Sequence, residues 1–140
     1  MERIGWIPLA LLSAMFAGLV AIFGKVGVSK VDPTLATAVR ALIMAGILVL
    51  AAAAVGGSGH LHEIDRRALL FIVLSGFAGA ASWLCYFVAL RLGPAPGVAA
   101  LDRLSVVFVL VFAIAFLGQA FTWKAAFGAA LLTVGAILLL

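Results

Sequence analysis

The chain has 140 residues, of which 67% are hydrophobic and only 10% are charged, and its mean hydropathy is +1.37. Soluble domains carry about 25% charged residues, so this composition excludes a soluble domain and indicates an integral membrane protein. The formal net charge of +4 does not indicate nucleic-acid binding, because the nine cationic residues are dispersed singly or in one pair and form no basic stripe.

Five apolar segments follow one another along the chain, and each is about long enough to cross a bilayer, which takes about 20 residues. They cover residues 6–28, 33–55, 69–90, 94–117 and 121–140. Their apolar residues are continuous rather than alternating, which favours α-helices over the strands of a membrane barrel. The sequence therefore predicts an all-α, polytopic membrane protein in which residues 1–140 form a single domain of five transmembrane helices.

The first segment follows Met1-Glu2-Arg3 and has the basic start of a signal peptide. Its apolar run is longer than the roughly 7 to 15 residues of a signal-peptide core, and further spans follow it. We therefore expect a retained first helix. The single cysteine, Cys85, lies in the third span and excludes an intrachain disulfide.

The connection between the second and third spans, residues 56–68, is the longest in the chain. It begins with glycines, ends with charged residues and contains His60 and His62. Two histidines without converging ligands are weak support for a metal site. The composition predicts a solvated surface loop and no bound metal.

The charges between the spans barely distinguish one membrane face from the other. The face that receives the N-terminus carries Arg3, Arg66, Arg67 and Lys124. The opposite face carries Lys25, Lys30 and Arg91, with Arg40 and Arg103 lying deeper within the spans near that face. The count is four against three, or four against five with the deeper arginines, so the excess of Lys and Arg that orients membrane proteins is missing. The chain is therefore predicted to insert in both orientations, unless factors such as first-helix hydrophobicity select one.

The third span carries a stripe of small and hydroxyl-bearing residues. Ser75, Gly79, Ser82 and Tyr86 follow helical spacing, with Trp83 beside them. Such residues pack membrane helices together, and aromatic rings with polar tips beside small residues also form pocket walls. We predict that Ser82, Trp83 and Tyr86 bind substrate, with helix packing as the alternative.

Three charged residues lie inside predicted spans. Arg40 lies about 10 Å along its helix from Pro33, and Asp102 and Arg103 lie about 12 to 14 Å past Pro94. Half of the hydrocarbon core is about 15 Å thick, so these groups should pair with one another or face water. We predict that Asp102 meets Arg40 or that Arg103 meets a neighbouring helix end. All three are candidate substrate-binding residues, with an ion pair that fixes helix position as the alternative.

Several short segments of the second half of the chain are distinctive in their order and spacing. They are SWLCYF at 82–87, ALRLGPA at 89–95, LDRLSVV at 101–107, FLGQ at 116–119 and a closing helix at 128–135. With these segments, essentially the whole chain resembles one EamA domain of the drug/metabolite transporter superfamily. Most members carry two such five-helix repeats in opposite orientation around a central cavity. The resemblance implies that this chain is one half of a ten-helix inverted-repeat transporter and works as an antiparallel pair.

The chain departs from that superfamily at two positions. Gly118-Gln119 stands where the family commonly has Gly-Glu, and the first span lacks the membrane-embedded glutamate of the smaller four-helix multidrug exporters. Proton coupling through that first-span position is therefore not expected. Asp102 is the only carboxylate inside a predicted span.

The sequence thus favours a transporter or exporter of a small metabolite or drug in the bacterial inner membrane, acting as an antiparallel homodimer with an alternating-access cavity. Its expected partners are a small-molecule substrate, membrane lipid and a second copy of the chain, with no nucleic acid and no cofactor. The aromatic pair Trp83 and Tyr86 would suit an apolar or cationic substrate group. The alternatives are a flippase of lipid-linked sugars and a non-transporting membrane scaffold. We expect no enzyme, because no catalytic triad, metal-ligand cluster or nucleotide loop is evident.

Overall fold

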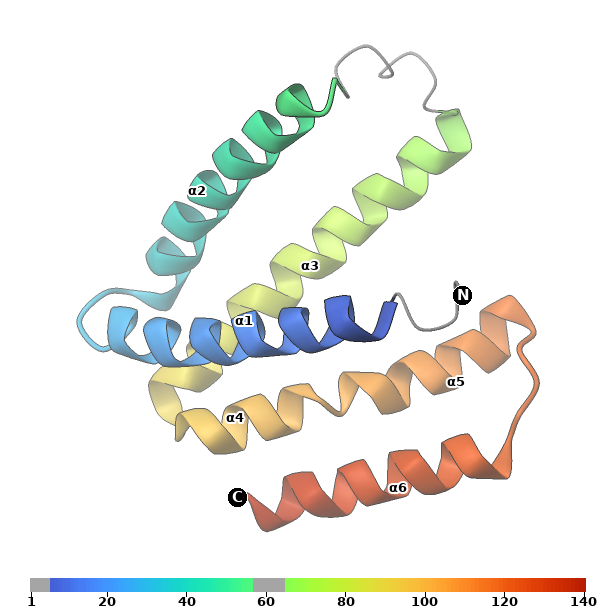
Figure 1. The fold of residues 1–140 in the computed structure, drawn as a ribbon. Helices are drawn as coiled ribbons and strands as arrows, with labels where there is room; N and C mark the ends of the chain where they lie inside the picture. The colour runs from blue at the N-terminus through green and yellow to red at the C-terminus, as the bar shows by residue number, and fades with distance from the viewer. Residues whose placement is uncertain (1–5, 57–64) are drawn as a thin grey trace. The chain divides into compact units, whose positions relative to one another are not determined.

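The computed structural model of the chain describes residues 6–56 and 65–140, which form helices joined by turns and short connections (Figure 1). The helices are α1 (Trp6–Gly27), α2 (Pro33–Ala54), α3 (Arg66–Leu92), α4 (Ala95–Asp102), α5 (Ser105–Leu117) and α6 (Trp123–Leu138). The first three are each long and apolar enough to cross a membrane, and so is the stretch Ala95–Leu117 that holds α4 and α5. The predicted all-α, polytopic fold is confirmed.

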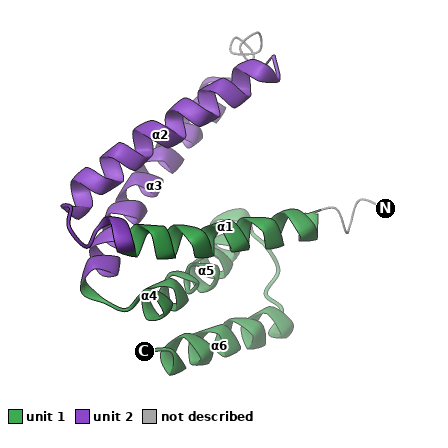
Figure 2. Cartoon of the chain, turned by 60° about the vertical axis from the view of Figure 1, so that its left-hand side comes forward, with its two compact units in different colours: residues 1–25, 92–140 green, residues 26–91 purple. Residues whose placement is uncertain are grey.

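The chain divides into two compact units, residues 26–91 and residues 1–25 with 92–140 (Figure 2). The first contains α2 and α3. The second contains nearly all of α1 together with α4, α5 and α6. Each unit is described below by itself.

In the unit of residues 26–91, α2 begins where the sequence predicts because Asp32 and Pro33 form a helix start signal. The Asp32 carboxylate accepts hydrogen bonds from the backbone N–H groups of Thr34 at 2.9 Å and Leu35 at 3.2 Å. Pro33 occupies the first helical turn, where its missing N–H leaves no hydrogen bond unmade. One turn later, the buried Thr37 hydroxyl donates to the Pro33 carbonyl at 2.7 Å.

α3 is longer than the predicted span. It begins at Arg66 rather than at residue 69, and the Leu69 N–H already donates to the Asp65 carbonyl at 2.9 Å. The apolar run ends before the backbone helix does, because Arg66 and Arg67 continue the helix as polar residues. The connection that contains His60 and His62 lies outside the described residues.

In the other unit, α6 packs against both α4 and α5. The buried side chains of these helices are small, namely Ala95, Ala113, Ala129 and Ala136. Small residues allow membrane helices to approach closely, and packing at close range drives their association. The chain approaches closely at Gly97 of α4, where a Cβ atom would be 3.3 Å from the carbonyl oxygen of Leu139, just past the end of α6.

The fourth predicted span is not one continuous helix. α4 ends at Asp102 and α5 begins at Ser105. Between them the Leu104 N–H donates to the Leu101 carbonyl at 2.9 Å, and the Val106 N–H donates to the Arg103 carbonyl at 3.1 Å. These bonds join residues three apart, so the chain tightens into a 3₁₀ turn, which often marks a hinge or local strain in a helix.

α5 is capped by Gly118, whose φ of 62° lies in the left-handed region that favours glycine. The Gln119 N–H donates back to the Ala113 carbonyl at 3.2 Å, which closes the helix end. Gly118-Gln119, part of the FLGQ segment, therefore works as a helix stop.

The last predicted span, 121–140, contains α6, a helix of 16 residues. At 1.5 Å per residue such a helix is about 24 Å long, whereas the hydrocarbon core is about 30 Å thick. Phe121 and Leu140 extend the apolar segment beyond the two helix ends. A short span of this kind is accommodated by local thinning of the bilayer.

Candidate functional site

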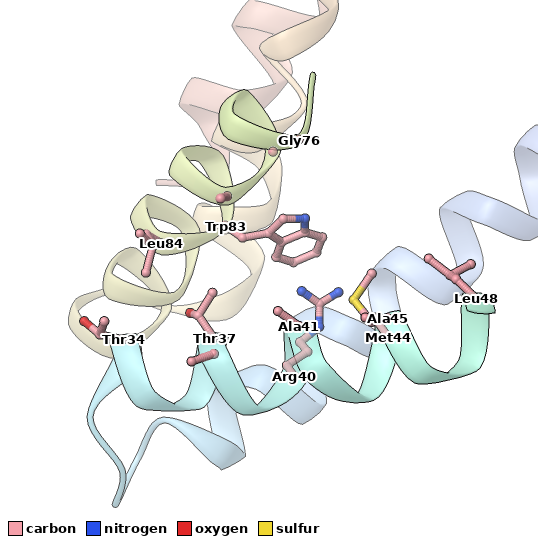
Figure 3. A pocket seen from close by; sticks show the side chains of 13 residues that line it. Thr34, Thr37, Arg40, Ala41, Met44, Ala45, Leu48, Gly76, Trp83 and Leu84 are labelled. Carbon is pink, nitrogen blue, oxygen red and sulfur yellow. The ribbon is translucent and has the colours of Figure 1, made fainter. Parts of the chain in front are cut away.

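A groove with a volume of about 510 Å³ lies between α2 and α3, inside the unit of residues 26–91 (Figure 3). α2 contributes Thr34, Thr37, Arg40 and Met44 to its wall, among others. Their spacing of three or four residues places them on one face of the helix. Ligand pockets for small molecules have volumes of about 300 to 1,000 Å³, so the groove is large enough for a metabolite.

Small residues on α3 leave the space that the groove occupies. Gly76, Gly79 and Ala80 line it, and a Cβ atom at either glycine would meet nothing within 4 Å. Larger side chains at these positions would project into the open space between the two helices. Part of the small-residue stripe of the third span therefore creates a cavity instead of a close helix contact.

The charged group of the groove is Arg40, which stacks on an aromatic ring from the facing helix. Its Cζ atom lies 3.6 Å from the centroid of the Trp83 ring and 5.5 Å from that of Phe87. Figure 3 shows the guanidinium group of Arg40 beneath the Trp83 ring, with Met44 beside it. A cation–π contact of this kind stabilises by about 0.5–2 kcal/mol, the larger values being found where water is excluded.

Trp83 is held in place by two further rings of α3. Its centroid lies 5.5 Å from that of Tyr86 in an edge-to-face arrangement at 84°, and 5.9 Å from that of Phe87. Edge-to-face pairs contribute about 0.5–1.5 kcal/mol beyond the area they bury. Phe87 is almost completely buried, with 3% of its surface exposed. The three rings, hereafter the aromatic cluster, form a rigid support for the Arg40 guanidinium.

Arg40 has no anionic partner among the described residues of its own unit. The described carboxylates there are Asp32 and Asp65, and neither lines the groove. Aromatic rings stabilise a cation without cancelling its charge. The groove between α2 and α3 therefore presents a single positive charge among apolar and small side chains.

Asp32 caps the N-terminus of α2 and does not line the groove. Hydrogen bonds from the Leu35 and Thr34 N–H groups, together with the nearby positive charge of Arg91, lower the pKa of this carboxyl group below its ordinary value. The Asp32 side chain is therefore ionised at neutral pH, and its negative charge lies at the N-terminus of α2, where the helix dipole favours it.

The structure brings together three of the six residues predicted to bind substrate. Arg40 and Trp83 line the groove, and Tyr86 contacts the Trp83 ring. Ser82 is exposed and does not line the groove, because helix geometry places it on the side of Trp83 away from Leu84, which does line it. Sequence reasoning missed Phe87, although its position four residues after Trp83 signals a contact on the same helix face.

The other two predicted residues, Asp102 and Arg103, lie in the other unit at the end of α4, and both are exposed. Arg103 lines a second groove of about 520 Å³ on α4 and α6, beside Gly128 and Gly135. Because Asp102 and Arg40 belong to different units, their pairing stays a prediction. Within residues 6–56 and 65–140, no group of three or more His, Cys, Asp or Glu side chains could hold a metal ion.

Comparison with known proteins assigns a family to this architecture. Residues 4–140 match the model of the EamA-like transporter family. The chain is also similar to a protein of Sinorhizobium sp. described as an uncharacterized transporter in the cobO 3' region, with 44% identity over 134 residues that cover 96% of this chain and 95% of the relative. No solved structure matches the chain.

Proposed function

Because the chain belongs to the EamA-like transporter family, we propose that it carries a small metabolite or drug across a membrane as an antiparallel homodimer. Transport is the activity of the family, and the apolar helices make the chain an integral membrane protein. The observation that carries the proposed site is the groove between α2 and α3, where one arginine is presented on the aromatic cluster. An ionisable group at membrane depth is costly and usually serves function.

Two observations support the homodimer. The Sinorhizobium relative aligns with this chain over 95% of its own length, and that length is about the length of one five-helix repeat. The loop charges favour neither orientation. In an inverted-repeat transporter, two such halves rock against each other around a site near the midplane.

The proposed membrane is the bacterial cytoplasmic membrane. In the alternating-access cycle that we propose, the groove on α2 and α3 binds substrate, and the turn between Asp102 and Ser105 bends as access switches from one side to the other. Discontinuous membrane helices are common at the binding sites of secondary transporters.

Flux into proteoliposomes tests transport itself. The purified protein is reconstituted and tested with a panel of amino acids, sugars, nucleotide-related metabolites, organic acids, cationic drugs and lipid-linked sugars. We expect flux of at least one class, and Arg40→Gln should reduce that flux about tenfold or more, since a charged hydrogen bond contributes about 1.5–3 kcal/mol. A correctly inserted protein that moves no member of the panel, lipid-linked sugars included, would instead be the scaffold.

Orientation-biased variants test the pairing. The face that receives the N-terminus carries four loop cations, and the opposite face carries three. Lys30→Gln with Gln119→Arg changes these counts to five and two. The triple variant Arg66→Gln, Arg67→Gln and Val31→Lys changes the counts to two on the face of the N-terminus and four on the opposite face. We expect each variant alone to be inactive and the two co-expressed to recover flux, because only the mixture supplies both orientations. Wild-type flux from either variant alone, inserted in one orientation, would contradict the antiparallel pair.

A further inference from the structure

We propose that the groove between α2 and α3 binds an amphipathic organic anion, whose carboxylate meets the Arg40 guanidinium and whose apolar body lies along the small-residue wall of α3. This inference rests on the proposed function, because it names the substrate class of the same groove. It also replaces the apolar or cationic substrate group that the aromatic residues alone suggest.

Charge is the first argument. Arg40 is the charged residue of the groove wall, and the described carboxylates of its unit, Asp32 and Asp65, do not line it. The Asp32 carboxylate is already engaged by the Thr34 and Leu35 N–H groups. An anionic ligand would neutralise Arg40 in a site of low dielectric, whereas a cationic ligand would be repelled by it.

The second argument is that Arg40 already occupies the ring face that a cationic ligand would need. Its Cζ atom is 3.6 Å from the Trp83 centroid, which is the distance of a stacked guanidinium. Stacking uses the flat face of the guanidinium and leaves its N–H groups, which lie in the plane, able to donate. The guanidinium fork matches a carboxylate in geometry.

The rest of the groove suits an apolar body. Met44 and Leu48 of α2 line it together with Gly76 and Gly79 of α3. The Thr37 hydroxyl, a polar group near Arg40, is already donating to the Pro33 carbonyl at 2.7 Å. The polar side chains that α2 contributes lie between residues 34 and 40, and residues 41–48 contribute apolar ones. The groove of about 510 Å³ therefore combines a polar part with the apolar part that an aryl or alkyl carboxylate requires.

Three compounds that differ only in their polar group test the charge preference, namely 3-phenylpropionate, 3-phenylpropanamide and 3-phenylpropylamine. Binding is read from the fluorescence of Trp83 in the full chain in detergent, after Trp6→Phe and Trp123→Phe remove the other tryptophans. We expect the propionate to bind about tenfold or more tightly than the amide, since a charge-assisted pair is stronger than a neutral one. The amine should bind weakest.

Arg40→Gln should remove the preference for the propionate, and Arg40→Lys should keep part of it, because lysine retains the charge but not the stacked fork. Lys124→Gln is the matched control, since it removes one exposed positive charge at the start of α6 and should leave the preference unchanged. Thermal unfolding of each variant shows that it is folded.

Equal affinity for the three compounds in the wild-type chain, or tightest binding of the amine, would overturn the proposal. So would quenching by phosphatidylglycerol but not by the propionate, which would make the occupant a lipid headgroup. The transport proposal and the anion-site proposal can be refuted independently. Propionate binding without flux of any compound refutes transport and keeps the anion site, whereas flux of the amine without propionate binding refutes the anion site and keeps transport.

Discussion

At the scale of single residues, the contact between Arg40 and Trp83 defines the candidate site. A double-mutant cycle with Arg40→Met and Trp83→Leu should give a coupling energy of about 0.5–2 kcal/mol, the range of cation–π contacts. The energy is obtained from the thermal unfolding of the wild type, the two single variants and the double variant in detergent. Additive effects of the two substitutions would show that the stacked pair does not form.

Asp32 provides a residue-scale prediction on pH. Its folded pKa is lowered by the Leu35 and Thr34 N–H groups, so its carboxylate contributes stability that is complete above the unfolded value of about 3.9 and is lost as the pH falls through the folded pKa. Asp32→Asn keeps an acceptor for the helix cap but does not titrate. We therefore expect wild-type stability to decrease more steeply than that of Asp32→Asn below about pH 4. Identical pH profiles of the two melting temperatures would contradict this role.

Asp32→Ala removes the cap itself. It should lower the melting temperature at neutral pH more than Asp32→Asn does, because the N–H groups of Thr34 and Leu35 lose their acceptor. Lys30→Gln, an exposed neighbour in the same turn, is the control and should change the melting temperature little.

The sequence identified most of the residues of the candidate site but not how they meet. Arg40 stands out because a charge in a span is costly, and Trp83 because it lies beside small residues. Their contact joins residues far apart in the chain, and helical spacing within one span carries no information on the facing helix. For the same reason Ser82 could not be separated from its neighbour Trp83, although the two point in different directions.

At the scale of elements, Gly97 is a position where α4 and the end of α6 leave little room for added volume. A Cβ atom there would lie 3.3 Å from the Leu139 carbonyl oxygen and 3.5 Å from Pro94 Cγ, whereas one at Gly128 would meet nothing within 4 Å. Gly128→Ala should stabilise the protein by up to about 1 kcal/mol through helix propensity. Gly97→Ala should gain less or destabilise, because the end of α6 must shift. Equal gains in melting temperature would show that the two helices do not approach closely.

The positions of the spans could be predicted from hydropathy, but the break in the fourth span could not. Residues 94–117 are apolar except for Asp102, Arg103 and Ser105, and no proline or glycine marks the turn at Leu104. A change in backbone hydrogen bonding from residues four apart to residues three apart alters the backbone conformation, and it leaves no signal in the hydropathy of the sequence. The predicted ends of the third span differ from the ends of α3 for a related reason. Hydropathy shows where the apolar residues stop, whereas the helix continues into polar residues.

At the scale of the whole molecule, composition indicated a membrane protein, the continuous apolar runs indicated an all-α fold, and the resemblance to a single EamA domain indicated the family. Both are confirmed. The division of the chain at residues 26–91 had no signal in the sequence, because the boundary runs through the end of α1 and the end of α3, inside continuous apolar helices. Pairing with a second chain stays a prediction that rests on charge balance and on the superfamily.

Topology mapping tests the central claim, that two copies of this chain assemble in opposite orientations, most directly. Cys85, an exposed free thiol, is first replaced by alanine, and single cysteines are then introduced at the two ends of the chain and at Ser58. Each is labelled in intact cells with a membrane-impermeant maleimide before and after permeabilisation. We predict that each position is labelled from both sides of the membrane in comparable amounts. Labelling of each position from one side only would contradict the antiparallel homodimer.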